Sequence, residues 1–110
     1  MKRLFLLITV LMSTPAYSTG ASVEAKVLSA GIYGSGRLFV MLDQTIAEPG
    51  CNNTRFDVVA GHEQIETWLS IAMAAAISGK TVKVKTNGCF TIFPTMTPGD
   101  DTWFYLFGNK

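Results

Sequence analysis

The chain has 110 residues, 48% of them hydrophobic, and nine basic residues against eight acidic ones give it a formal net charge of +1. A chain of this length forms one domain, close to the size at which a hydrophobic core alone provides only modest stability. Such a nearly neutral composition lacks the excess of basic residues typical of nucleic-acid-binding proteins, so we expect no nucleic-acid partner.

The first eighteen residues have the pattern of a secretory signal peptide. Lys2 and Arg3 precede an apolar run over residues 4–12, and small residues occupy positions −3 and −1 of the bond after Ser18. The apolar run is roughly half as long as the ~20 residues that a membrane-spanning helix needs. We therefore expect cleavage after Ser18, with cleavage after Ala21 as the second choice and an uncleaved anchor as a less favoured alternative.

Cleavage after Ser18 would leave residues 19–110 as a single domain. This part of the chain contains seven basic and eight acidic residues, so its formal net charge is −1. It contains no second long apolar run, and we expect no membrane span after cleavage.

The two cysteines, Cys51 and Cys89, both lie in the expected mature domain. An even number of cysteines in a small exported domain predicts a structural disulfide. The chain-entropy model gives a stabilisation of about 4 kcal/mol for a loop of this length. A metal site or a redox dithiol is less favoured, because there is no CxxC motif and only one histidine, His62.

The mature part begins with a pattern typical of strands. Alternating residues from Val23 to Tyr33 predict a first strand, and Gly34-Ser35-Gly36 predicts a tight turn. A second strand is expected over residues 37–42, apolar on both faces, and a third short strand over 55–59 after a linker rich in turn-forming residues.

Residues 63–77 change to a helical period. Apolar residues recur at three- and four-residue spacing and predict an amphipathic helix that ends before Gly79. The expected core positions are Ile65, Trp68, Leu69, Ala72, Met73 and Ala76. A second helix face contains small residues and is compatible either with helix contacts in a ring or with the high helix propensity of alanine. Its members are Ser70, Ile71, Ala74, Ala75, Ile77 and Ser78.

Strict alternation over residues 81–86 predicts a fourth strand, and an aromatic-rich segment over 102–107 predicts a fifth. Five strands with one helix between the third and the fourth is the element order of the five-stranded OB-fold barrel. We therefore expect a mainly β, OB-fold-like barrel with one helix and one disulfide. A small α+β sandwich is an alternative with the same order.

The segment from Trp68 to Val84, followed by Gly88-Cys89, resembles small exported bacterial proteins related to the B subunit of subtilase cytotoxin. The resemblance is specific over residues 68–89. It implies an OB-fold, assembly into a homo-oligomeric ring and glycan binding. It identifies no glycan-binding residue in this chain, although Ser22 and Ser29 lie near the expected first strand.

The last strand provides the candidate ligand-binding residues. Alternation places Trp103, Tyr105 and Phe107 on one side of the strand and Phe104 and Leu106 on the other. One side must belong to the core, and exposed aromatic residues on the other side would mark an interaction site. The flat faces of aromatic rings suit stacking against sugars.

No motif in the sequence defines an enzyme, a cofactor or a metal site, and an exported hydrolase that combines His62 with a serine and a carboxylate is the least favoured alternative. His62 lies at the expected start of the helix. It has no free cysteine with which to form a Cys-His pair, and the sequence contains no GxSxG motif that would supply a serine nucleophile. Asp100-Asp101 follows Pro98-Gly99 and predicts a solvated turn, not a calcium site. Asn52-Asn53-Thr54 matches a glycosylation sequon, but we interpret it as a turn beside the disulfide.

These observations lead to the expectation of a non-catalytic binding module in the bacterial periplasm or outside the cell. The resemblance to toxin B subunits implies a glycan ligand and an oligomer. The alternative is a periplasmic accessory or inhibitor domain that binds another protein.

Overall fold

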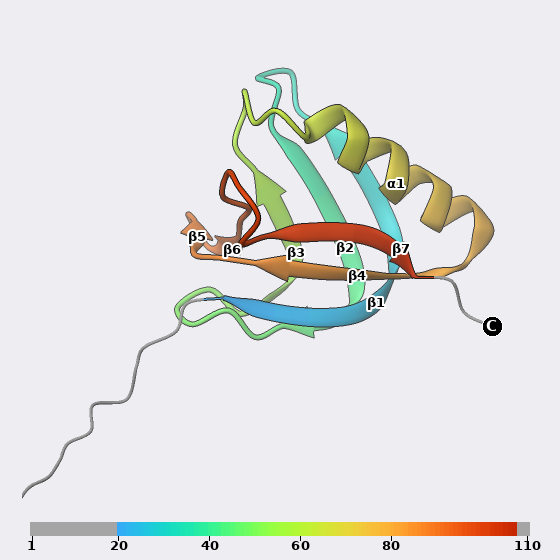
Figure 1. Cartoon of the computed structure of the whole chain (residues 1–110), viewed down its shortest axis with the longest axis horizontal. Helices are drawn as coiled ribbons and strands as arrows, with labels where there is room; N and C mark the ends of the chain where they lie inside the picture. Colours follow the sequence, from blue (N-terminus) through green and yellow to red (C-terminus); the bar gives the residue numbers. More distant parts are fainter. Residues whose placement is uncertain (1–19, 108–110) are drawn as a thin grey trace, which may run out of the picture.

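The computed structural model describes residues 20–107 (Figure 1). The expected signal peptide, residues 1–18, lies outside the described residues. In chain order the elements are β1 (Ala21–Ile32), β2 (Leu38–Ile46), β3 (Asn53–Val58), α1 (Ile65–Ser78), β4 (Thr81–Thr86), β5 (Cys89–Phe90), β6 (Phe93–Pro94) and β7 (Trp103–Phe107).

Five strands form one antiparallel sheet in the order β3-β2-β1-β4-β7, and β5 pairs with β6 in a separate short hairpin. The long strand β1 belongs to both halves of the sheet. Its first half, residues 21–26, pairs with β4, whereas residues 27–32 pair with β2. The register shifts between Val27 and Ser29, as in a β-bulge, and such an irregularity bends a strand. The sheet thereby curves until its two ends face each other (Figure 1).

The antiparallel five-stranded sheet, the helix between its third and fourth strands and the disulfide are confirmed, but a closed barrel is not. No strand ladder joins β3 to β7 within residues 20–107. Instead, Thr95 forms an isolated parallel bridge with Asp57 of β3, and its Oγ1 donates a hydrogen bond of 2.7 Å to the Asp57 carbonyl. The segment after β6 therefore occupies part of the edge of β3 that β7 would need in order to close the sheet.

The core lies between the two curved halves of the sheet. The alternate residues that point inward are apolar and almost fully buried. In the middle, the rings of Phe56 on β3 and Phe104 on β7 meet edge to face, with centroids 5.3 Å apart. The strand residues of the core are Ala25, Val27, Leu38, Val40, Leu42, Ile46, Phe56, Val58, Val82, Val84 and Phe104.

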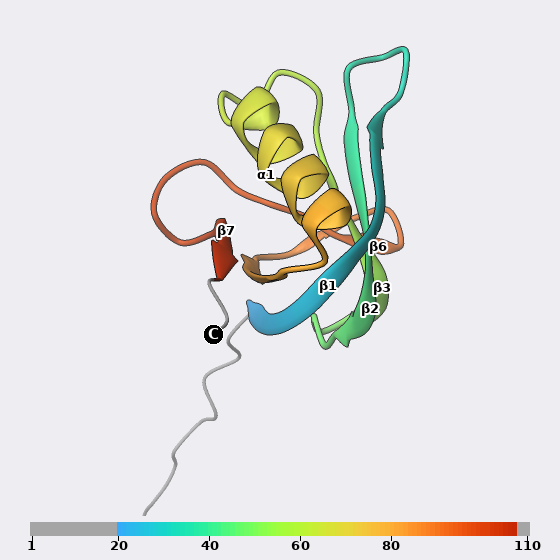
Figure 2. The ribbon, with the colours of Figure 1, turned by 90° about the vertical axis from the view of Figure 1, so that its right-hand side faces the viewer.

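Helix α1 packs on the side of the sheet between β1 and β7 (Figure 2). Its buried stripe has the spacing i, i+3, i+7, i+10 and consists of Ile65, Trp68, Ala72 and Ala75. The expectation for Met73 and Ala76 was wrong: Met73 is half exposed and Ala76 is exposed, because a single narrow stripe contacts the sheet. Ala75, assigned above to the small-residue face, belongs to the core.

The helix ends as the sequence predicts. Gly79 has a left-handed backbone, with φ of 75°, and its N–H donates to the Ala75 carbonyl at 2.9 Å. Glycine adopts this conformation without the steric penalty that other residues have. Within residues 20–107 no helix is both long and apolar enough to cross a membrane.

The disulfide and a buried carboxylate join the linker after β2 to the end of β4. Cys51 and Cys89 are bonded, with their Cα atoms 6.0 Å apart. Nearby, the fully buried Glu48 accepts hydrogen bonds from the backbone N–H groups of Gly20 and Gly88 and from Thr86 Oγ1, at 2.9, 3.0 and 2.6 Å. These contacts hold the start of β1, the linker and the end of β4 together.

Candidate functional site

The outer surface of β1, β4 and β7 carries polar and aromatic side chains, and we call it the aromatic face. Antiparallel register places residues of the three strands in rows across the sheet. One row runs through Ser22, Lys85 and Trp103, and the next through Glu24, Lys83 and Tyr105. The members of the aromatic face are Ser22, Glu24, Lys83, Lys85, Trp103, Tyr105 and Phe107.

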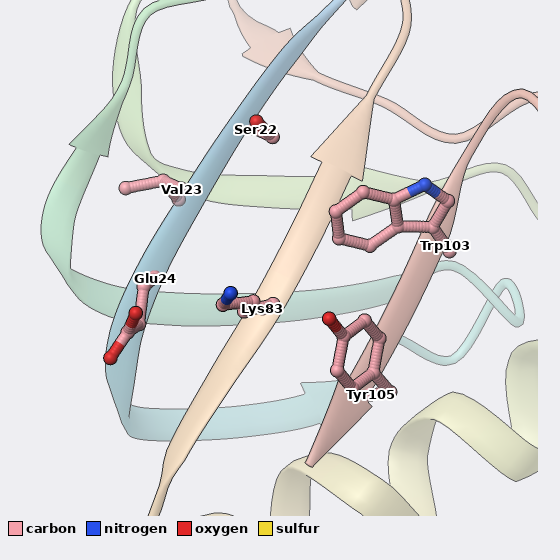
Figure 3. Close-up of a pocket in the computed structure, with 6 residues that line it drawn as sticks. All are labelled: Ser22, Val23, Glu24, Lys83, Trp103 and Tyr105. Atoms are coloured by element: carbon pink, nitrogen blue, oxygen red, sulfur yellow. The ribbon is translucent and has the colours of Figure 1, made fainter. Parts of the chain in front are cut away.

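Within the aromatic face, Trp103 and Tyr105 form a ring pair with centroids 5.5 Å apart and planes tilted by 43°. Lys83 Nζ lies 4.4 Å from the centroid of the Phe107 ring, a cation–π contact that holds the ammonium group over β7. A hollow of about 320 Å³ is lined by Ser22, Glu24, Lys83 and the Trp103–Tyr105 pair (Figure 3).

The hollow combines flat apolar surfaces with groups that form hydrogen bonds. Tyr105 is 44% exposed, so its ring is available to a ligand. The hydroxyl of Ser22, the carboxylate of Glu24 and the ammonium of Lys83 supply both donors and acceptors. Ligand pockets in proteins begin at about 300 Å³, so this hollow suits one small ring. A sugar ring, with apolar C–H faces and polar edges, has this combination of properties.

The three candidate residues of the last strand lie on one face, as the alternation predicts. Trp103, Tyr105 and Phe107 point outward, whereas Phe104 is buried in the core. Of the two serines near the first strand, Ser22 lines the hollow. Ser29 lies in the other half of β1, which pairs with β2, and is not among the lining residues.

His62 precedes α1 and is held by the backbone on both sides of its ring. Its Nδ1 accepts the backbone N–H of Gln64 at 3.1 Å, and its Nε2 lies 3.2 Å from the carbonyl oxygen of Thr97. The ring also packs against Trp68, with centroids 4.8 Å apart. These contacts tie the start of the helix to the loop before β7. A hollow beside His62 is lined also by Gly61, Glu63 and Pro98, which offer few groups for ligand binding.

Of the other polar motifs, Asp100-Asp101 lies in a turn as expected, whereas the expected turn at Asn52-Asn53-Thr54 was wrong for Asn53 and Thr54, which begin strand β3. Asp100 and Asp101 are exposed in the loop before β7. No group of three or more His, Cys, Asp or Glu side chains that could hold a metal ion occurs in the described part of the chain. Asn53 begins β3, and its Nδ2 donates a hydrogen bond of 3.4 Å to the Ile92 carbonyl.

Sequence reasoning missed a cluster of charged and aromatic residues around β3. Arg55 and Asp57 lie in β3, Arg37 immediately precedes β2, and Tyr33 immediately follows β1. Asp57 is fully buried and pairs with two arginines, Arg37 and Arg55. Arg55 also donates a hydrogen bond of 2.7 Å to the hydroxyl of Tyr33. Because Arg55 and Asp57 are two residues apart in a strand, they share one face. In the sequence, this two-residue spacing was the one feature that could have indicated the cluster.

The electrostatics of this cluster follow from its hydrogen bonds. The hydrogen bond from Arg55, with a further contribution from Arg37, lowers the pKa of the Tyr33 phenol below its usual value. Hydrogen bonding to Asp57 raises the pKa of Arg55. Arg55 therefore stays charged, and the phenolate form of Tyr33 is stabilised.

Comparisons with known proteins return nothing: no family model, no curated protein and no solved structure matches this chain.

Proposed function

We propose that this chain is an exported, non-catalytic binding module that holds a glycan on its aromatic face. The observation that carries the proposal is the Trp103–Tyr105 ring pair beside the side chains of Ser22, Glu24 and Lys83 in one hollow. Exposed contiguous aromatic residues usually mark an interaction site. A pyranose ring stacked on Trp103 would direct its hydroxyl groups toward these polar side chains.

The fold supports the same proposal. The curved five-stranded sheet and the position of α1 are compatible with a variant of the OB-fold in which the segment after β6 replaces the closing strand contact. The resemblance of residues 68–89 to toxin B subunits favours a glycan ligand and a homo-oligomer. We place the protein in the bacterial periplasm or outside the cell, as the signal peptide and the disulfide suggest.

The non-catalytic part of the proposal is supported by the surroundings of His62. Both of its ring nitrogens face backbone groups, and its ring packs against Trp68. A general base needs a free nitrogen within reach of the proton that it removes. His62 therefore acts as a structural contact in this account.

The test is a glycan array probed with the mature protein and with Trp103→Ala, together with the mass of each in solution. We expect the mature protein to bind a defined set of glycans and Trp103→Ala to lose most of that signal. Ile92→Ala is the matched control, because Ile92 is 66% exposed in the turn between β5 and β6 and lies outside both the aromatic face and α1. A monomer that binds no glycan would contradict the proposal.

A second candidate is an accessory or inhibitor domain that binds another periplasmic protein. One observation favours it: within residues 20–107, β7 pairs with a strand on one side only, so its other edge is available for an added strand. Affinity purification from a periplasmic extract separates the two candidates. A single stoichiometric protein partner, lost when β7 carries Leu106→Pro, would favour this alternative.

A further inference from the structure

The cluster around β3 shares no residue with the aromatic face. It is built around Asp57, whose side chain is fully buried. Arg55 donates to both carboxylate oxygens, with Nε to Oδ1 at 2.6 Å and Nη2 to Oδ2 at 2.8 Å. This bidentate ion pair compensates the charge of Asp57, since a guanidinium and a carboxylate match one another in shape and charge.

Arg37 is the second cation beside the same carboxylate. Its Nε lies 3.0 Å from Asp57 Oδ2. The approach is not aligned for a hydrogen bond, and the buried Nε has no hydrogen-bond partner among residues 20–107. Two guanidinium groups and one carboxylate leave one positive charge in excess. Burying a charge without full compensation is costly, so an anion at Arg37 would stabilise the cluster.

Aromatic rings hold the Arg37 side chain in position. Its Cζ lies 4.3 Å from the centroid of the Tyr33 ring and 5.0 Å from that of Phe90. Phe90 follows the disulfide-bonded Cys89 in β5, so the disulfide anchors the backbone beside the ring that contacts Arg37. A held guanidinium loses little conformational freedom when it binds a ligand.

The Arg37 side chain remains 27% exposed. Its guanidinium also contributes to the hydrogen bonding that lowers the pKa of the neighbouring Tyr33 phenol. A guanidinium has more N–H donors than this contact uses, so donors remain for a ligand in its plane. A carboxylate is planar and carries a single negative charge, which equals the local excess.

We propose that Arg37 is the anchor of a second binding site, specific for a carboxylate group. The carboxylate accepts hydrogen bonds from the terminal nitrogens of Arg37 and lies beside the exposed Tyr33 ring. The source of the carboxylate is either the end of a peptide or an acidic sugar, because both present the same group. This proposal does not depend on glycan binding at the aromatic face.

The experiment is an NMR titration of ¹⁵N-labelled mature protein, purified from the periplasm, at constant ionic strength. Acetate is the first probe. We expect saturable shifts of the Arg37 Nε–H signal and of the neighbouring backbone amides. Arg37→Lys keeps the positive charge but removes the paired donors, and we expect it to weaken binding about tenfold or more. Lys80→Gln is the control for loss of one exposed positive charge and should leave the titration unchanged.

Two further pairs of probes distinguish the sources. A short peptide with a free C-terminal carboxylate is compared with its amide, and glucuronate is compared with glucose. Stronger binding of the peptide acid or of glucuronate than of acetate supports the site and identifies the source; equal binding of all three acids supports a site that recognises the carboxylate alone. The proposal is overturned if acetate causes no saturable shift, or if Arg37→Lys responds as the original protein does.

Two controls keep the interpretation clear. A thermal melt of Arg37→Lys must match that of the original protein, and Arg37→Gln provides a second variant if it does not. Trp103→Ala leaves the Arg37 cluster unaltered, so loss of glycan binding in that variant would not alter the carboxylate titration.

Discussion

Glu48 and Thr86 are joined by a hydrogen bond of 2.6 Å between two fully buried side chains, 38 residues apart in the chain. The same carboxylate accepts the N–H groups of Gly20 and Gly88. Each buried donor left without a partner costs about 1–3 kcal/mol. We therefore expect Glu48→Ala to lower the free energy of unfolding by about 3 kcal/mol or more, as measured by urea denaturation of the mature protein.

The control for this prediction is Glu63→Ala. Glu63 is exposed, and such a surface substitution should change the free energy of unfolding by less than about 0.5 kcal/mol. Equal effects of the two substitutions would show that the Glu48 contacts do not hold the strands together.

The same contacts discriminate between the two expected cleavage sites. Cleavage after Ala21 would remove Gly20, which donates to Glu48, and Ala21, which is opposite Thr86 in the first pair of the β1–β4 ladder. Cleavage after Ser18 keeps both. We therefore predict that intact-mass spectrometry of the exported protein finds a chain that starts at Thr19, and a chain that starts at Ser22 would contradict this.

The disulfide should contribute a large part of the stability. In the chain-entropy model, a loop of this length contributes about 4 kcal/mol by restricting the unfolded chain. We expect the double variant Cys51→Ser/Cys89→Ser to lose stability of this order in urea denaturation. Dithiothreitol should destabilise the original protein and leave the double variant unchanged. A loss of less than about 1 kcal/mol in the free energy of unfolding would show that the remaining contacts stabilise the fold without the disulfide.

Tyr33 gives a pH-dependent prediction. Because hydrogen bonding to Arg55 lowers its pKa, the phenolate forms at lower pH in the folded protein than in the unfolded chain. The resulting stabilisation is present above the unfolded pKa, near 10, and is lost as the pH falls through the folded pKa. Absorbance at 295 nm should show an early tyrosine ionisation, and Tyr33→Phe should remove this step. An unchanged titration in Tyr33→Phe would contradict the assignment.

The local elements were predictable because their signals are local. Gly79 ends α1 with the left-handed backbone that the sequence indicates, and β4 has the predicted bounds, Thr81–Thr86. The disulfide between Cys51 and Cys89 was predictable from the number of cysteines and from the signal peptide that the sequence leads us to expect. The shared face of Trp103, Tyr105 and Phe107 followed from the period of a strand.

The long-range contacts were not predictable. Nothing near Glu48 in the sequence indicates that it is buried against Gly20, Thr86 and Gly88, because its partners come from two other segments. The pairing of Arg37 with Asp57 likewise requires the register of β2 and β3. Barrel closure was expected from element order alone, and element order does not reveal that Thr95 lies beside β3.

The most direct test of the central claim is saturation-transfer difference NMR with a panel of neutral monosaccharides, using the mature protein and Trp103→Ala. The account predicts saturation of the C–H protons on one face of at least one sugar, and its loss in Trp103→Ala while the fold is retained. Equal saturation transfer in the two proteins, or none in either, would contradict a sugar-binding role for the aromatic face.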